Sequence, residues 1–359
     1  MLNITKFKSI EAFSNSQFSS QKNLLLDFIW IGDEGSSELG QYLTQCENLE
    51  VLQLYLQKNQ ITQQGMIDLS KGIGQCQHLN HLLIDLRSNF MESEGVSCLG
   101  KELAHLSKLK NLEIYFSKNG NLDSGMIDFA FGIKSCVNLK KLFLYLQDNQ
   151  IGDTGALSLG QGFEQCQNLE NLVIELTDNK LNKDGALKLI EGIAKAQNLS
   201  SLSLFLCHNN IGDEGASSTG LALGQSKKLK NLTLDFSLNS VGSVGVTGLI
   251  NGLKQNINIE YLNLQLESNQ IDGDSFINLG FGLKQITNLK ILKIRINYNF
   301  IQHDSIIQFC CLLKKFMNLN IFSLAVDIDL YAQEVVHKFL NIIYKCPRLV
   351  KQDLTLSWV

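Results

Sequence analysis

Residues 139–168, LKKLFLYLQDNQIGDTGALSLGQGFEQCQN, contain the pattern that decides the fold. From Leu142 to Leu146 leucine alternates with other residues, which is the period of a strand that buries one face. After Gly155 the stretch ALSLGQGFEQC is typical of a helix. In an earlier copy of this segment, Leu69 and Ile73 lie four positions apart and therefore share one helical face.

The same strand, turn and helix recur every 30 residues without an insertion between Leu49 and Leu349. A column of asparagines follows the strand in nine successive units: Asn59, Asn89, Asn119, Asn149, Asn179, Asn209, Asn239, Asn269 and Asn299. One unit alone cannot bury its apolar edge, but stacked units share a continuous core. We therefore expect repeat units that begin near residues 49, 79, 109, 139, 169, 199, 229, 259, 289 and 319.

The unit L-x-x-L-x-L-x-L-x-x-N-x-I, followed by a glycine-containing turn and a helix, resembles the leucine-rich repeat family, in particular its ribonuclease-inhibitor-like type. The resemblance covers residues 23–359. An extra x-L pair lengthens the strand, and the chain is rich in Gln, Asn and Lys, so it is also similar to repeat arrays of ciliates. The resemblance implies that the asparagine column bonds the backbone of neighbouring turns in a ladder.

The expected fold class is α/β, a right-handed leucine-rich-repeat solenoid with about ten full repeats plus caps. Neighbouring strands of a sheet lie about 4.8 Å apart, whereas packed helices need about 8–10 Å. This difference predicts a horseshoe with parallel strands on the concave face and helices on the convex face.

The ends of the chain depart from the repeat. We expect a cap or loose segment over residues 1–22 and a single solenoid over residues 23–359, with a terminal strand at 349–359. In the first, partial repeat, Leu24 and Leu26 fit the pattern and Ile29 stands at the asparagine position. Whether the chain is part of a longer protein stays open.

Composition and charge argue against several function classes. The net charge is −4 and no basic stretch is present, so we predict neither a nucleic-acid partner nor membrane binding. The sequence lacks a run of roughly 18 apolar residues that would cross a membrane, and its start lacks the features of a secretory signal. We therefore expect a cytoplasmic protein, and cytoskeletal or ciliary association stays open.

The nine cysteines predict neither disulfides nor a metal site. Five of them share one position near the helix end and are expected to be buried thiols: Cys46, Cys76, Cys136, Cys166 and Cys346. Cys76, His78 and His81 have a zinc-like spacing, but they project in three directions. The sequence contains no phosphate-binding loop and no nucleophile–base pair, so we predict no cofactor, no metal and no catalytic residue.

The variable strand positions between the fixed leucines are the candidate binding site. Aromatic and acidic side chains gather there: Tyr55, Asp85, Glu113, Tyr115, Phe143, Tyr145, Glu175, Phe205 and Asp235. Exposed aromatics are enriched in protein interfaces, where they tend to dominate the binding energy. We predict a non-catalytic protein–protein interaction scaffold that binds, on the concave face, a protein partner with basic residues and an apolar anchor. The alternative that these aromatics only pack on one another stays open.

Two other functions and the oligomeric state stay open as well. One is the repeat or regulatory portion of a larger protein such as a kinase. The other is a GTPase-activating repeat protein, which would need an arginine within reach of its partner. Arg87, one of three arginines in the chain, follows Asp85 near the same face.

Overall fold

The computed structural model describes residues 4–328, 333–346 and 348–358. The chain divides into two compact units. The first unit comprises Met1–Lys180 and Lys195–Leu199, and the second comprises Leu181–Ala194 and Ser200–Val359.

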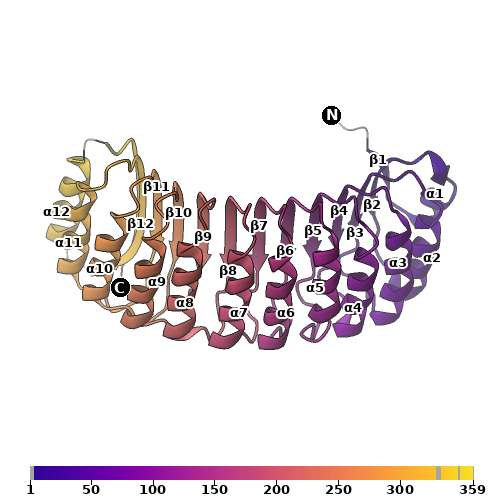
Figure 1. Ribbon diagram of the computed structural model, residues 1–359, viewed down its shortest axis with the longest axis horizontal. Helices are drawn as coiled ribbons and strands as arrows, with labels where there is room; N and C mark the ends of the chain where they lie inside the picture. The colour runs from indigo at the N-terminus through magenta and orange to yellow at the C-terminus, as the bar shows by residue number, and fades with distance from the viewer. Residues whose placement is uncertain (1–3, 329–332, 347, 359) are drawn as a thin grey trace. The chain divides into compact units, whose positions relative to one another are not determined.

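The first unit contains seven parallel strands in sequence order (Figure 1). Its elements are β1 (Thr5–Phe7), α1 (Ile10–Ser14), the 3-10 helix η1 (Phe18–Ser20), β2 (Asn23–Asp27), α2 (Gly32–Leu43), β3 (Val51–Tyr55), α3 (Gln63–Gln75), β4 (His81–Asp85), α4 (Glu92–Leu103), β5 (Asn111–Tyr115), α5 (Met126–Ser135), β6 (Lys141–Tyr145), α6 (Asp153–Glu164) and β7 (Asn171–Glu175).

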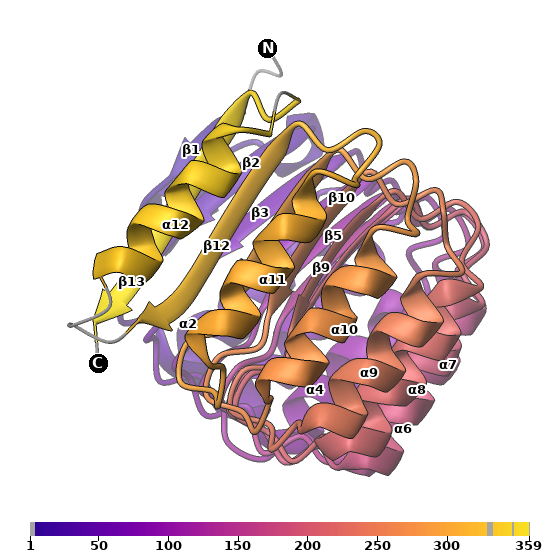
Figure 2. The ribbon, with the colours of Figure 1, turned by 90° about the vertical axis from the view of Figure 1, so that its left-hand side faces the viewer.

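The second unit continues the alternation of strand and helix. Its helices lie on one side of its parallel strands, as Figure 2 shows for α9 to α11. Its elements are α7 (Lys183–Ala194), β8 (Ser201–Phe205), α8 (Gly212–Gly224), β9 (Asn231–Asp235), α9 (Ser243–Leu253), β10 (Tyr261–Gln265), α10 (Gly273–Leu283), β11 (Ile291–Arg295), α11 (His303–Leu313), β12 (Ile321–Ile328), α12 (Gln333–Tyr344) and β13 (Lys351–Trp358).

The predicted α/β repeat of parallel strands and helices is confirmed. Along the described residues the strand–helix pair occurs eleven times, from β2–α2 to β12–α12, and β13 begins a twelfth unit. The core consists of the leucine columns, of which Leu52, Leu54 and Leu56 are fully buried. Complete burial of one such side chain contributes about 1.5–3 kcal/mol relative to an exposed one.

The first repeat differs from the prediction. Pairing of β2 with β3 places Leu24 beside Leu52 and Leu26 beside Leu54, an offset of 28 residues rather than 30. The turn after β2 is therefore two residues shorter than later turns, and Ile29 does not occupy the asparagine position. The buried leucines decide this register, because a slip by one residue would turn them to the other face of the sheet.

The residues before β2 form ordered structure. The short strand β1 pairs with β2, and Phe13 of α1 is fully buried. The ring of Phe18 stacks on that of Tyr42 from α2, with centroids 5.4 Å apart. This aromatic cluster covers the apolar end of the first repeat. Residues 1–3 of the predicted cap lie outside the described residues.

Close contacts between glycines bring neighbouring helices together. A Cβ atom at Gly72 of α3 would lie 2.2 Å from the carbonyl oxygen of Gly40 of α2. A Cβ at Gly132 of α5 would lie 2.1 Å from the carbonyl oxygen of Gly100 of α4. Side chains are absent at these positions because each helix approaches the backbone of the helix before it.

Each turn contains a residue in the left-handed conformation, one position before the ladder asparagine. Its φ lies between 54° and 62° at Lys58, Ser88, Lys118, Asp148, Asp178, His208, Leu238, Ser268 and Tyr298. This conformation is uncommon for residues other than glycine, and it is least favourable for bulky side chains. Leu238 and Tyr298 are therefore the exceptional members of this column.

Candidate binding face of the sheet

The last residues of β3 to β7 lie side by side on the sheet face that is turned away from the helices. The strand register pairs Tyr55 with Asp85, Asp85 with Tyr115, Tyr115 with Tyr145, and Tyr145 with Glu175. Directly opposed side chains on neighbouring strands lie roughly 5 Å apart, so they touch. Glu113 and Phe143 form the adjacent pair on the same face.

Arg87, Tyr115 and Tyr145 form one layered cluster, the aromatic stack. The Tyr115 and Tyr145 rings are stacked, with centroids 4.4 Å apart and planes inclined by 1°. The guanidinium carbon of Arg87 lies 5.2 Å from the centroid of the Tyr115 ring. Because Arg87 follows β4 and Tyr145 ends β6, the Tyr115 ring lies between them.

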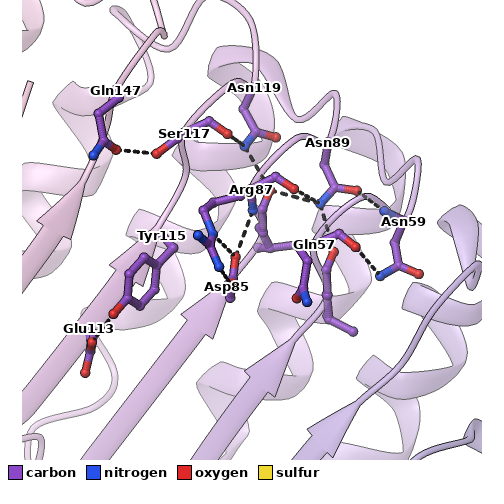
Figure 3. Close-up of polar contacts among 12 residues, drawn as sticks. Gln57, Asn59, Asp85, Arg87, Asn89, Glu113, Tyr115, Ser117, Asn119 and Gln147 are labelled. Atoms are coloured by element: carbon purple, nitrogen blue, oxygen red, sulfur yellow. Dashed lines mark hydrogen bonds and ion pairs between the residues drawn. The ribbon is translucent and has the colours of Figure 1, made fainter. Parts of the chain in front are cut away.

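A buried carboxylate holds Arg87 in place. Arg87 donates hydrogen bonds to Asp85 from Nε (2.9 Å, to Oδ1) and from Nη2 (2.6 Å, to Oδ2), as Figure 3 shows. Asp85 is 2% exposed, whereas the side chain of Arg87 is 49% exposed. The hydrogen bonds with Asp85 raise the pKa of Arg87, so its positive charge is stabilised. Asp85 is thus an internal counter-ion and not an exposed acid at the edge of the aromatics.

Glu113 is the acidic centre of this face. Its carboxylate accepts a hydrogen bond from the hydroxyl of Tyr115 (Figure 3). Burial, followed by the charge of Glu113, raises the pKa of Tyr55 and of Tyr145. Burial and the hydrogen bond to Glu113 raise the pKa of Tyr115. The three phenols therefore remain neutral hydrogen-bond donors at physiological pH.

His81 lies on the same face, at the start of β4. Burial lowers its pKa, and the positive charge of Lys141 lowers it further, while Glu113 acts in the opposite direction. His81 is therefore predominantly neutral near pH 7. The imidazole therefore adds no positive charge to the face, on which Lys141 is an exposed cation at the start of β6.

The predicted aromatic stretch is divided between the two units. Tyr115, Phe143 and Tyr145 belong to the first unit. Phe205 ends β8 of the second unit, where it pairs in register with Asp235 of β9. Each unit therefore has its own set of candidate residues.

The ladder asparagines bond the backbone of adjacent turns (Figure 3). Asn89 Oδ1 accepts hydrogen bonds from the backbone N–H of Asn59 (3.0 Å) and of Ile61 (2.9 Å). Asn89 Nδ2 donates to the carbonyl oxygens of Leu56 and Leu86, both at 2.9 Å. Its side chain thereby satisfies buried backbone groups that the turn leaves without partners.

The remaining asparagines that the sequence singled out make bonds of the same kind. In the first unit the carbonyl oxygens of Leu86, Phe116 and Leu146 accept from the side chains of Asn119, Asn149 and Asn179. In the second unit Asn209, Asn239, Asn269 and Asn299 each accept from the backbone of the preceding turn.

Aspartates in the first turn of α2 and α8, and in the turn before α5, add a second set of contacts between repeats. Asp123 Oδ1 accepts from the backbone N–H of Gly152 and of Gly155, both at 2.8 Å. Asp33 and Asp213 bond the turns that follow them in the same way. The first N–H groups of a helix have no partner within the helix, so a carboxylate from the preceding repeat caps them.

The cysteine column forms part of the core. Burial raises the pKa of Cys76, Cys136 and Cys166 to about 12 in each case. A thiol is reactive as its thiolate, so these three are chemically inert at neutral pH. In the part of the chain that the structure describes, no three His, Cys, Asp or Glu side chains are arranged to hold a metal ion. None of the described helices has the length and apolarity needed to cross a bilayer.

Sequence reasoning did not identify three features of these faces. They are the pairing of Arg87 with Asp85, the hydrogen bond from Tyr115 to Glu113, and a cationic pair on β11, Lys293 and Arg295. The sequence does contain a signal for Lys293 and Arg295. At the exposed strand positions, earlier repeats have mostly aromatic and acidic residues, whereas this repeat has lysine and arginine.

Comparison with known proteins identifies the repeat. A family model described as Leucine Rich repeat matches residues 142–160 and 195–218. The first match covers most of β6 and the first part of α6, and the second covers β8 and the beginning of α8. A search of curated proteins found no match. The ribonuclease-inhibitor-like type and the similarity to ciliate arrays stay predictions. Because both matches fall on copies of the strand–helix pair that repeats along the described residues, this chain is a leucine-rich repeat protein.

Proposed function

We propose that this protein is a non-catalytic interaction scaffold that binds a protein partner on the exposed sheet face of its first unit. Leucine-rich repeat domains are generally protein-interaction scaffolds. The observation that carries the proposal is the aromatic stack of Arg87, Tyr115 and Tyr145, anchored by the buried carboxylate of Asp85.

The stack is ordered before any partner arrives. Tyr115 is held by its hydrogen bond to Glu113 and by two flat neighbours, the Arg87 guanidinium and the Tyr145 ring. Side chains that are already fixed lose little conformational entropy on binding, so more of the contact energy appears as affinity. Rigid tyrosines and arginines are the residue types that most often dominate binding energy in interfaces.

The charges of the face favour a basic partner. Arg87 compensates Asp85, whereas no lysine, arginine or histidine among the described residues forms an ion pair with Glu113. A lysine or arginine of the partner would lie against the Tyr145 ring beside Glu175, which pairs with Tyr145 in the register. There it would gain both cation–π and charge attraction. Phe143, which is half-buried, would contact an apolar anchor of the partner.

The test compares Tyr145→Ala with a matched exposed aromatic on the helix side, Phe131→Ala, which is 50% exposed on α5. Affinity capture with mass spectrometry identifies the partners, and titration measures their Kd. Tyr145→Ala should weaken binding by about 2 kcal/mol or more, roughly 30-fold in Kd. Phe131→Ala should leave Kd unchanged.

Phe205→Ala, measured separately, reports whether the second unit contributes to the same partner. The thermal unfolding curve of each variant verifies that the fold is kept. If Tyr145→Ala retains every partner at wild-type affinity, the tyrosines are packing residues and the proposal fails.

The thiols support an intracellular location for this scaffold. The five cysteines of the column are free, buried thiols: Cys46, Cys76, Cys136, Cys166 and Cys346. Unpaired thiols are typical of reducing compartments. We place the protein in the cytoplasm on this basis, and fractionation of native cells with a tagged chain tests the assignment.

A further inference from the structure

The exposed sheet face of the second unit contains a hollow over β10 to β13, here called the β10–β13 hollow. Its volume is about 530 Å³. The hollow forms because Ser323, Ala325 and Thr355 on β12 and β13 are small. In the first unit, the positions equivalent to Ala325 carry large side chains such as Tyr115 and Tyr145.

Lys293 supplies a positive charge in this hollow. It is exposed at the third position of β11. Its neighbours in register are uncharged, with Asn263 on β10 and Ser323 on β12. The closest aromatic contact is the Tyr261 ring, whose centroid lies 5.8 Å from Nζ. No acidic side chain among the described residues forms an ion pair with Lys293.

Arg295 supplies the second cation, two residues further along the same face of β11. It is exposed and pairs in register with Gln265 and Ala325, which are both uncharged. Its ion pair with Glu267 joins Nε to Oε2 at 3.2 Å. A guanidinium group has five N–H donors in a fixed planar arrangement, so it can bind carboxylate or phosphate strongly and with defined geometry.

Another acidic group close to the hollow, Asp327, is already engaged. Its carboxylate accepts a hydrogen bond from Asn297 Nδ2 (3.0 Å) and another from the backbone N–H of Tyr298. The charge of Asp327 is therefore already met by two hydrogen-bond donors of the turn after β11.

Tyr298 lines the hollow in an unfavourable backbone conformation. Its φ is +58°, and its side chain is 64% exposed. Most residues at the equivalent turn positions are small or polar, which fits the left-handed region better. Bulky residues held in this way cluster at binding sites, because the strain persists only where the surrounding structure enforces it. Phe300, which is 65% exposed on the same turn, extends the apolar surface.

We infer that the β10–β13 hollow binds a segment of a protein partner that carries an oxyanion next to an apolar residue. The oxyanion, a carboxylate or a phosphorylated side chain, would pair with Lys293 and Arg295, and the apolar residue would contact Tyr298. We infer an acidic occupant because its charge would complement the two cations. The proposed site shares no residue with the aromatic stack in the first unit.

The experiment selects ligands from a displayed library of random peptides, roughly twelve residues long, against the full chain. Selected peptides are synthesised with a fluorescent label, and their Kd is measured by anisotropy. Each is compared with a version in which glutamine replaces its acidic residues and with a version that carries phosphoserine there. Lys293→Gln with Arg295→Gln is the test variant. Lys284→Gln with Lys314→Gln is the control, because it removes the same charge at the ends of α10 and α11.

The selected peptides should be enriched in acidic residues beside an apolar one. The test variant should raise their Kd by about tenfold or more, whereas the control variant and Tyr145→Ala should not change it. The glutamine peptides should bind at least about tenfold more weakly than their acidic parents. Tighter binding of the phosphoserine peptide would identify phosphate as the oxyanion, and tighter binding of its parent would identify carboxylate.

Three results would overturn the inference. One is a selection whose peptides lack acidic residues, and another is an equal loss of affinity in the control variant. The third is a dimer in sedimentation that dissociates only in the Lys293 and Arg295 variant, since the occupant would then be a second copy of this chain. Because Tyr145→Ala leaves this hollow intact, failure here and failure of the first-unit site can be told apart.

Discussion

At the scale of single residues, the contact between Arg87 and Asp85 has the clearest energetic consequence. Removal of the guanidinium leaves a buried carboxylate, 2% exposed, without its charged partner. We expect Arg87→Ala to lower the free energy of unfolding by about 1–3 kcal/mol, which is the usual cost of an unsatisfied buried polar group. The midpoint of urea unfolding measures this loss.

The double variant Asp85→Asn with Arg87→Ala is the control for that prediction. It removes the buried charge together with its partner and should recover most of the lost stability. An Arg87→Ala midpoint equal to that of the wild type would mean that water replaces the guanidinium at no cost.

The buried cysteines predict how stability depends on pH. Burial, with a smaller contribution from Cys166, raises the pKa of Cys136 from 9.0 to about 12. The unfolded chain therefore releases this proton near pH 9 while the folded chain retains it. The stabilising contribution is complete below pH 9 and is lost between pH 9 and about 12, at most about 1.4 kcal/mol for each pH unit.

Urea unfolding at about pH 8 and pH 10 checks this prediction in the wild type and in Cys136→Ala. The Cys136→Ala variant should lose less stability over this interval, whereas the exposed Cys311 changed to Ala should behave as the wild type does. If both variants lost the same amount of stability between these two pH values, the loss could not be assigned to Cys136.

At the scale of elements, the packing of α3 on α2 depends on a missing side chain. Alanine favours an isolated helix over glycine by about 1 kcal/mol, so propensity alone predicts that Gly72→Ala stabilises. Its Cβ would lie 2.2 Å from the Gly40 carbonyl oxygen, and that oxygen belongs to the backbone and cannot rotate away. We expect a net loss of about 1–3 kcal/mol, typical of an overpacked core.

Gly152→Ala is the matched control for the helix contact, because the nearest atoms to its Cβ would lie 3.7 Å away. Thermal unfolding should show a lower midpoint for Gly72→Ala and little change for Gly152→Ala. A stabilised Gly72→Ala variant would mean that the two helices separate easily and that helix propensity dominates.

At the scale of the whole molecule, each proposed binding face is built from residues of one unit. The first has half-buried tyrosines with Glu113, and the second has Lys293 and Arg295. We therefore expect the two sites to act independently. Tyr145→Ala should affect the basic partner alone, and the Lys293 and Arg295 variant the acidic partner alone. In the combined variant the changes in binding energy should add within about 0.5 kcal/mol.

Titration of each partner in the presence of saturating amounts of the other measures this independence. A coupling free energy between the two ligands well above about 0.5 kcal/mol would indicate that one ligand contacts both units.

The sequence alone determined which residues form the core, because a buried strand face needs alternation and a buried helix face needs neighbours four positions apart. It thereby also determined which side chains lie on the exposed face, from Tyr55 to Glu175. It could not determine what each exposed residue contacts, since those contacts join residues about 30 positions apart and depend on conformation. The sequence predicted an exposed Asp85, and only the tertiary structure showed that Asp85 is buried and paired with Arg87.

Contacts between residues that are distant in the sequence also decided the first turn and the hollow of the second unit. A constant spacing of 30 residues placed Ile29 at the asparagine position, but pairing of β2 with β3 buries Leu24 and Leu26 only if the first turn is shorter. Lys293 and Arg295 are isolated letters in the sequence. They become the charged residues of a hollow because parallel pairing places them beside the small side chains of β12. Local patterns determine the elements and their buried faces, whereas side-chain size and charge on adjacent strands decide the sites.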